Sequence, residues 1–557
     1  MKTSDFFTLP ILHTSPVYQI DPSTVKNLEL TTVNDSNNDT DKLALYHNVF
    51  DYDDGDKLAS DTVNEFANHY TTNITFLNQT QQLVDNFKVD SNNKVFKQAN
   101  NAHDIWKTIT VNEHFLETYN YMEWKSLSFL NHSSEYLQAT TMCTIFSPIL
   151  SILSPILMAI IPFIMLRLHG ITITVSSYIS SFWLLIKSSS MGKILSTETT
   201  LMEKLFGILS LGMYVFSLYQ NVQSCIQFDV NMKQIHTYCY DLHEYCMNTI
   251  ALMDQCIGNM ATLSEYVNFA KTVEKQKTIL YQMAIRLREV DKYEYTVTKA
   301  RELGTIMKYF YELHTNNVYN ECIMYSFGFV KYMQLMTSVN ANMSRATFIT
   351  DPKTTQCIIK DSYYPATDCK ITNSISLDKN KIITGPNASG KTTLLKSTFF
   401  NIILSQQIGY GFYSSAILCP YDGLCCYINI PDTSGRDSLF QAEAKRCSHI
   451  VEEIKATPTK RTFCIFDELF SGTNPTEASI CSLEFMKHLS TFENVTWLLT
   501  THFVDVCNTP IARCMNYKML THIKNDNIKY TYKMKRGIST AQSATLILSE
   551  LFPNMFK

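Results

Sequence analysis

The sequence predicts a multidomain protein of α + α/β class, in which a long helical region precedes a C-terminal three-layer α/β domain. Three observations support this class. At 557 residues the chain exceeds the size of a single hydrophobic core. Apolar residues recur at helical spacing between positions 221 and 342, and short strand-like runs alternate with helical ones after position 355. The expected domains are listed by residue range: 1–140 (mostly helical), 141–220 (apolar), 221–350 (helical, lever-like or clamp-like) and 355–557 (α/β).

Composition narrows the possible functions. The formal net charge is −4, so no global basic field indicates nucleic-acid binding, and a DNA contact would need a local patch. The 16 cysteines follow no regular spacing, which favours reduced thiols in an intracellular protein over a disulfide framework. The N-terminus shows no basic segment followed by an apolar one, so we expect no secretory signal.

An uncharged run at residues 142–166 is long enough to cross a bilayer as a helix, and further apolar runs follow at 171–186 and 205–219. Two alternatives compete. In one, residues 142–166 and the following run form a membrane hairpin with Arg167 and Lys187 at its ends. In the other, these runs are buried helices of a large soluble core.

Three prolines separate these alternatives. Pro148, Pro155 and Pro162 recur every seven residues and therefore lie on one side of a helix. A proline costs about 3 kcal/mol inside a soluble helix but is tolerated in membrane helices. The sequence therefore favours membrane association of residues 142–219.

The region from 221 to 342 has a helix-packing seam with a seven-residue repeat. Its apolar positions are Cys239, Cys246, Met253 and Met260, with Leu242, Cys256 and Leu263 on the companion stripe. This seam predicts either a lever-like or coiled-coil arm or the core of a helical bundle, and periodicity does not separate the two.

A phosphate-binding loop begins at Gly385. Its spacing is G-x-x-x-x-G-K-[ST], it follows the apolar run 381–384, and a helix-compatible run begins at Thr393. In such a loop, backbone N–H groups and a helix N-terminus surround phosphate. We expect Lys391 to reach the β- and γ-phosphates of ATP and Thr392 to bind Mg²⁺. The expected nucleotide-binding residues are Gly385, Pro386, Asn387, Ala388, Ser389, Gly390, Lys391, Thr392 and Thr393.

Two acidic residues end a second apolar strand, at residues 463–466. We expect Asp467 to hold Mg²⁺ through water or through Thr392, and Glu468 to orient and deprotonate the attacking water as a general base. A third strand ends in His502, where ATPases of the ABC type carry a histidine that senses the γ-phosphate. Ser438, at the start of an expected amphipathic helix, is either a helix cap or an anion site that closes over the ATP of a second subunit.

These motifs resemble those of the MutS family of DNA mismatch repair ATPases. The similarity covers roughly residues 355–557 and, more loosely, the helices from 221. The matching segments are Ile382–Thr393, Ser438–Glu443, Asp467–Ala478, Thr501–Phe503 and Lys529–Ser539, with Tyr364, Pro365 and Asn373 near further family positions. The Gly-Thr-Asn-Pro form at 472–475 is similar to a divergent MutS-related branch.

The resemblance implies an ABC-type P-loop ATPase that uses ATP and Mg²⁺ and dimerises through its ATPase domain, as a homodimer or a heterodimer. It also implies a DNA-binding clamp in repair or recombination. Two departures from the family pattern follow. Residues 1–140 lack the family's Gly-x-Phe-Tyr-Glu wedge, so we expect no mismatch reading, and the segment after the ATPase domain is too short for the family's C-terminal dimerisation helices. The apolar segment 142–219 supports an alternative, a membrane-associated mechanochemical ATPase whose client is not DNA.

Overall fold

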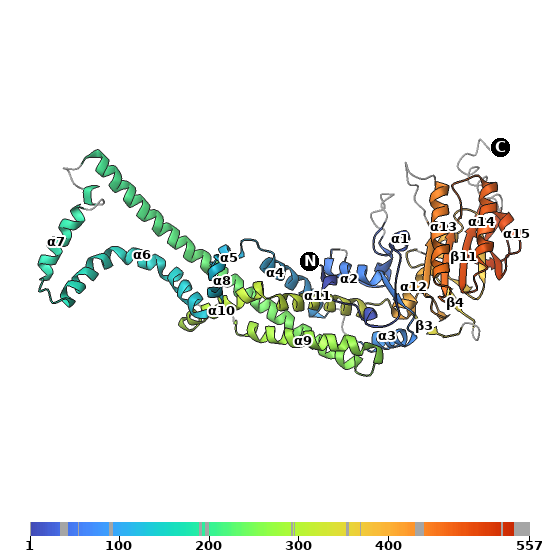
Figure 1. Cartoon of the computed structure of the whole chain (residues 1–557), viewed down its shortest axis with the longest axis horizontal. Helices are drawn as coiled ribbons and strands as arrows, with labels where there is room; N and C mark the ends of the chain where they lie inside the picture. Colours follow the sequence, from blue (N-terminus) through green and yellow to red (C-terminus); the bar gives the residue numbers. More distant parts are fainter. Residues whose placement is uncertain are drawn as a thin grey trace. The chain divides into compact units, whose positions relative to one another are not determined.

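The computed structural model describes residues 2–33, 43–53, 55–87, 93–188, 192–194, 200–290, 293, 296–351, 356–367, 369–428, 439–524 and 527–539. The chain forms two compact units. Unit 1 consists of Met1–Asn100, Thr249–Thr278 and Cys322–Lys557, and unit 2 consists of Asn101–Asn248 and Ile279–Glu321. Both units appear in Figure 1.

Unit 2 is helical in its described part. Its helices are α5 (Phe115–Thr118), α6 (Ser134–Leu168), α7 (Val175–Ser188) and α10 (Val297–Thr315). Four further helices contribute residues to both units: α4 (Lys94–Thr110), α8 (Leu201–Met260), α9 (Val267–Arg288) and α11 (Asn317–Thr337). The region from residue 221 is helical as expected, but its residues are divided between the two units.

Unit 1 contains a six-stranded sheet with the order β13-β12-β6-β11-β10-β9. Its strands are β6 (Asn380–Thr384), β9 (Gly423–Tyr427), β10 (Thr462–Asp467), β11 (Val495–Thr501), β12 (Cys514–Lys524) and β13 (Asn527–Arg536). Five strands are parallel, and only the edge strand β13 pairs antiparallel to its neighbour. Parallel strands end at the same edge of a sheet, so the residues that follow β6, β10 and β11 come together.

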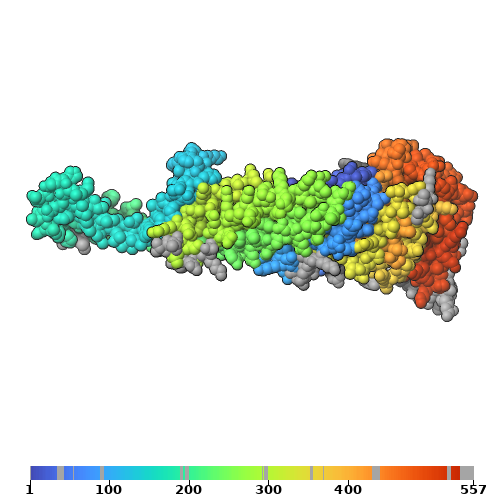
Figure 2. Space-filling model, turned by 90° about the horizontal axis from the view of Figure 1, so that it is seen from below, coloured from blue at the N-terminus to red at the C-terminus, as the bar shows by residue number. Residues whose placement is uncertain are grey.

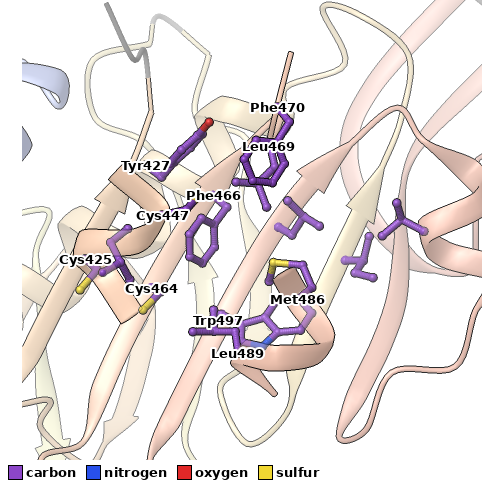
Figure 3. Close-up of a cluster of buried hydrophobic side chains, with 14 of the residues drawn as sticks. Cys425, Tyr427, Cys447, Cys464, Phe466, Leu469, Phe470, Met486, Leu489 and Trp497 are labelled. Carbon is purple, nitrogen blue, oxygen red and sulfur yellow. The ribbon is translucent and has the colours of Figure 1, made fainter. Parts of the chain in front are cut away.

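Helices cover both faces of this sheet, as the alternating strands and helices predicted (Figure 1). On one face, α12 (Lys391–Ile408) packs Phe399 against Phe463 of β10. The other face carries α13 (Leu439–Ala456), α14 (Pro475–Leu489) and α15 (Val504–Asn508). Figure 3 shows the core on that side, where Cys447 and Met486 meet Phe466 and Trp497. Successive β10 side chains alternate between these two cores, which builds three layers.

A second, five-stranded sheet has the order β5-β4-β8-β3-β7. Its strands are β3 (Ser344–Phe348), β4 (Ile358–Ser362), β5 (Asn373–Ser376), β7 (Tyr410–Gly411) and β8 (Ser415–Leu418). The strands expected near residues 355–360 and 371–377 are β4 and β5. The N-terminal residues add α1 (Pro22–Asn27), α2 (Lys57–Ala67), α3 (Ile74–Asn86) and the antiparallel pair β1 (Val17–Gln19) and β2 (His69–Thr71).

Residues 1–100 belong to the same compact unit as the α/β domain, which differs from the separate N-terminal region expected from the sequence. The physical reason lies in two buried amides of α12. Gln406 donates to the backbone oxygen of Thr71, and Gln407 donates to those of Phe66 and His69. A buried amide must find hydrogen-bond partners, and here the N-terminal backbone supplies them.

The packing seam is buried as predicted: Cys239, Cys246, Met253 and Met260 are at most 1% exposed. All 16 cysteines are free, and most are buried, which confirms the expectation of core thiols.

The apolar stretches of α6 and α8 are exposed, unlike the buried packing seam. The most hydrophobic 18-residue stretch of α6 has no buried residue, and that of α8 is 6% buried. Figure 2 shows α6 and α7 in cyan and teal, with a surface that no other described segment covers on that face. The alternative of buried helices in a soluble core is therefore wrong for α6 and for the start of α8.

We predict that Gln407→Leu destabilises unit 1 by about 3 kcal/mol. The leucine would leave two buried carbonyls and the Tyr46 hydroxyl, which donates to Gln407 at 2.6 Å, without partners. Urea-induced unfolding of the full chain, followed by tryptophan fluorescence, measures this loss. Gln82→Leu on the exposed side of α3 is the matched control and should change stability by less than about 0.5 kcal/mol. Equal effects of the two substitutions would contradict the docking role of Gln407.

Candidate nucleotide-binding site

The candidate site lies at the edge of the six-stranded sheet where three parallel strands end. β11 lies between β6 and β10, and its residues Leu498–Thr501 pair with Lys381–Thr384. Asp467 pairs with Thr500 across the other side of β11. The phosphate loop after β6, the acids after β10 and His502 after β11 are therefore neighbours in space.

The phosphate loop has the backbone of an anion nest. Ala388 and Gly390 have φ angles of 59° and 88°, a region that turns successive N–H groups toward one side of the chain. Gly390 caps α12, which begins at Lys391, so the positive end of that helix faces the loop. The Ser389 hydroxyl is buried without a hydrogen-bond partner, as expected for a cradle that takes an oxygen-rich ligand.

The Lys391 ammonium sits at the centre of the site and is only 5% exposed. It donates hydrogen bonds of 3.2 Å to the backbone oxygens of Gly385 and Pro386 and lies 3.7 Å from Glu468 Oε1. Burial lowers the pKa of Lys391, and the nearby carboxylate of Glu468 opposes that shift. A buried cation held by two carbonyls is suited to exchange them for phosphate oxygens.

Thr392 and Asp467 form a pair of oxygens that fits Mg²⁺. The Thr392 hydroxyl donates to Asp467 Oδ2 at 2.7 Å, and the Thr500 hydroxyl donates to Asp467 Oδ1. Adjacent ligands of an octahedral Mg²⁺ with bonds of about 2.05 Å lie about 2.9 Å apart. Two protein oxygens at this spacing match the sparse protein ligation that Mg²⁺ takes beside phosphates.

His502 links the other two charged groups. Its Nε2 lies 2.8 Å from Glu468 Oε1 and 3.0 Å from Lys391 Nζ. One imidazole nitrogen makes only one of these bonds at a time, since it donates to Glu468 when protonated and accepts from Lys391 otherwise. The hydrogen bond from His502, with the charges of His502 and Lys391, lowers the pKa of Glu468, which favours its carboxylate form.

A cavity of about 640 Å³ opens from the phosphate loop. Glu468 lies on its wall, whereas Asp467 and His502 are not among the residues that line it. The volume is within the usual range for small-molecule sites. The lining residues from the loop run from Asn387 to Thr393.

Sequence reasoning missed part of this cavity. Tyr363 and Ile371 line it although they belong to no motif, and Tyr532 lines it although the resemblance gave its segment, Lys529–Ser539, no role in nucleotide binding. Tyr532 approaches the loop closely, because a Cβ on Gly390 would lie 3.1 Å from its ring. No local pattern places these side chains at the loop, because they reach it only through the packing of separate segments.

The late strand and the segment before the loop meet as the resemblance implied. Asn373 donates to the Tyr532 backbone oxygen at 3.0 Å and accepts from Met534 N–H at 2.8 Å. Ser539 N–H donates to the Thr384 hydroxyl at 2.8 Å. The Asn373 contacts hold β13 beside β5, and the Ser539 contact holds the residues after β13 beside the end of β6. Ser438 lies outside the described residues.

Glu443 on α13 holds the loop that follows the two acids. It is 2% exposed and accepts hydrogen bonds from Ser471 N–H, the Ser471 hydroxyl and Gly472 N–H, at 3.0, 3.0 and 3.2 Å. Gly472 is required there, because a Cβ would meet Phe440 N at 2.8 Å. Glu468 itself has a φ of 52°, an uncommon conformation that the loop must maintain.

Comparison with known proteins identifies the domain that carries the site. Residues 381–552 match the family model of MutS domain V. This part of the chain is a MutS-type domain. Within this MutS-type domain lie the phosphate loop, both acids, His502 and Glu443, so the matched region contains the geometry described above.

The MutS relatives match over a limited part of their length. The chain is similar to MutS protein homolog 4 of Mus musculus, with 31% identity over 30% of this chain and 18% of that protein. It is 26% identical to DNA mismatch repair protein MutS of Persephonella marina, over 32% and 22% of the two chains. It is 29% identical to endonuclease MutS2 of Staphylococcus saprophyticus, over 31% of this chain and 22% of that protein. The matched region thus spans about a fifth of each of these relatives.

We predict that Glu443→Ala lowers kcat for ATP hydrolysis by about tenfold to a hundredfold, while the Kd for ATP stays within about twofold. The substitution frees two backbone N–H groups beside Glu468 without touching the phosphate loop. Steady-state kinetics and ATP titration separate the two quantities. Glu452→Ala, at an exposed position of the same helix, is the control and should behave like the parent. A parallel loss of binding and turnover would mean a general structural role.

Proposed function

We propose that this protein binds and hydrolyses ATP with Mg²⁺ at the site formed by Lys391, Thr392, Asp467, Glu468 and His502. The observation that carries this proposal is the junction of Lys391 with Glu468 and His502, beside Thr392 bonded to Asp467. A cation, a magnesium-type oxygen pair and a carboxylate base are the parts that phosphoryl transfer to water requires.

Each residue has a distinct role in this proposal. Backbone N–H groups from Gly385 to Thr393 surround the phosphates, and Lys391 neutralises the β- and γ-phosphate charge. Thr392 and Asp467 hold Mg²⁺, which supplies charge stabilisation when bound. Glu468 orients the attacking water and accepts its proton. His502 holds Glu468 in place and responds to the γ-phosphate.

ATP-driven dimerisation extends the proposal. Ser438 would contribute an anion site to the ATP of a second subunit, as in ATPases of the ABC type, and hydrolysis would reopen the dimer. The contact of Glu443 with the loop after Glu468 supports this coupling, because it joins α13 to the acidic edge of the sheet. Homodimers and heterodimers both satisfy this arrangement.

DNA is the proposed client of the dimer, as a clamp in repair or recombination. The printed names of the relatives, which include a DNA mismatch repair protein, support a DNA role. Residues 1–100 pack with the α/β domain in one compact unit and do not form a separate N-terminal domain. This packing supports a DNA role that does not include mismatch reading. The alternative, a membrane-associated ATPase of the same fold with a non-DNA client, is favoured by the exposed apolar helices α6 and α8.

For the ATPase we predict a contrast between two substitutions. Lys391→Ala should abolish ATP binding, because it removes the buried cation of the phosphate loop. Glu468→Gln should preserve ATP binding but slow hydrolysis by roughly two to four decades, the scale of a lost general base. Equilibrium binding of a fluorescent ATP analogue and phosphate release measure the two effects. Unaltered ATP affinity in Lys391→Ala, or an unaltered rate in Glu468→Gln, would overturn the site.

For the DNA role we predict salt-dependent binding that ATP modulates. Raising salt from about 50 mM to about 200 mM should weaken double-stranded DNA binding by at least about tenfold, because phosphate contacts release counterions. Fluorescence anisotropy on the full chain, with and without ATP, measures this. The ATP effect should vanish in Lys391→Ala. Absence of DNA affinity at low salt would favour the membrane-associated alternative.

A further inference from the structure

Two long helices of unit 2 carry apolar side chains on every side. In α6, the consecutive residues Ile156, Leu157 and Met158 are 52%, 38% and 76% exposed. Consecutive helical residues point about 100° apart, so these three alone cover most of the circumference. A helix that docks in a protein groove is apolar on one stripe, whereas one that is apolar all round is surrounded by core or by lipid.

Charged residues lie at both ends of the uncharged run on each helix. On α6 the uncharged run lies between Glu135 and Arg167, and on α8 it lies between Lys204 and Asp229. The two runs are roughly 46 Å and 36 Å long at about 1.5 Å per residue, and a bilayer core is about 30 Å thick. The basic ends Arg167 and Lys204 lie toward α7, where they suit anionic lipid headgroups.

Hydrogen bonds tie α6 to α8 within these runs. The Tyr214 hydroxyl donates to the Ser151 backbone oxygen at 2.9 Å, and the Asn221 amide donates to the Ser151 hydroxyl at 2.6 Å. Polar side chains that pair between helices are the contacts that stabilise helices in lipid. Helix α8 therefore pairs with α6 at Ser151, whereas the run from 171 to 186, which the sequence suggested as the partner, packs on α6 nearer its end, at Ala159 and Phe163.

Helix α7 is too short to cross a bilayer. Its bounds are Val175–Ser188, about 21 Å of helix. It packs on the end of α6, where the Tyr178 hydroxyl donates to the Ala159 backbone oxygen at 2.7 Å. Its Trp183, Leu184 and Leu185 are 58% to 68% exposed, which suits the interfacial layer of a membrane.

We propose that α6 and α8 form a two-helix hairpin that crosses a lipid bilayer, with the loop between α6 and α7 on the far side and α7 folded back against the end of α6. The occupant of the apolar surface is lipid, because the apolar exposure surrounds each helix and each uncharged run is at least as long as a bilayer core is thick. The three prolines inside α6 agree with this environment. The inference is independent of the ATPase proposal.

Flotation of the full chain tests insertion. The chain is synthesised in a cell-free system with vesicles of phosphatidylcholine and phosphatidylglycerol, and we expect it to float with them and to resist alkaline carbonate. Ile156→Asp with Ile160→Asp should lower the ratio of vesicle-bound to free chain by about tenfold or more. Val318→Asp, at an exposed apolar position of α11, is the matched control and should float like the parent.

Labelling from outside the vesicles tests the crossing. Thr172→Cys, in the loop between α6 and α7, should react with a membrane-impermeant maleimide only after permeabilisation, whereas the exposed Cys369 should react at once. Labelling of position 172 in intact vesicles would overturn the crossing. A chain that stays with the unbound fraction, or that forms dimers abolished by the paired aspartates without binding vesicles, would overturn insertion. ATP turnover of each variant shows separately whether the ATPase domain is intact.

Discussion

The buried ammonium of Lys391 is the constraint on which the site depends. A cation that is 5% exposed is unfavourable unless charged or polar groups meet it, and here two loop carbonyls, Glu468 and His502 do so. Those groups come from three separate strands, so the parallel register of β6, β11 and β10 must hold for the ammonium to be satisfied. The strand pairing that forms the sheet therefore also forms the site.

Support for this arrangement comes from segments far away in the sequence. α12 starts at Lys391 and ends among N-terminal residues, where the Gln406 and Gln407 amides bond to the backbone of β2 and α2. α13 reaches the opposite side of the site and holds the loop after Glu468 through the buried carboxylate of Glu443. Buried polar groups thus specify which segments surround the nucleotide site, because each has few alternative partners.

The helices α6 and α8 follow a different physical rule. In unit 1, apolar side chains are removed from water by the two faces of the sheet, as the Phe466 and Trp497 cluster shows (Figure 3). In α6 and the start of α8, side chains of the same kind remain exposed on all sides. Burial of apolar surface is the main favourable term in folding, and the bilayer that we propose would supply this burial from outside the chain.

Much of the site was determined by the sequence alone, because its chemistry is local. The phosphate loop, the acids at 467 and 468 and His502 each follow a strand within a few residues, and local pattern reveals such residues. The same holds for the helical region from 221, whose periodicity is a property of neighbouring turns. Only the tertiary structure decided the rest. The place of residues 1–100 beside α12, the Tyr532 wall of the cavity, the Glu443 contact and the pairing of α6 with α8 all join residues distant in sequence. No local pattern records such contacts, since they exist only once separate elements have packed together.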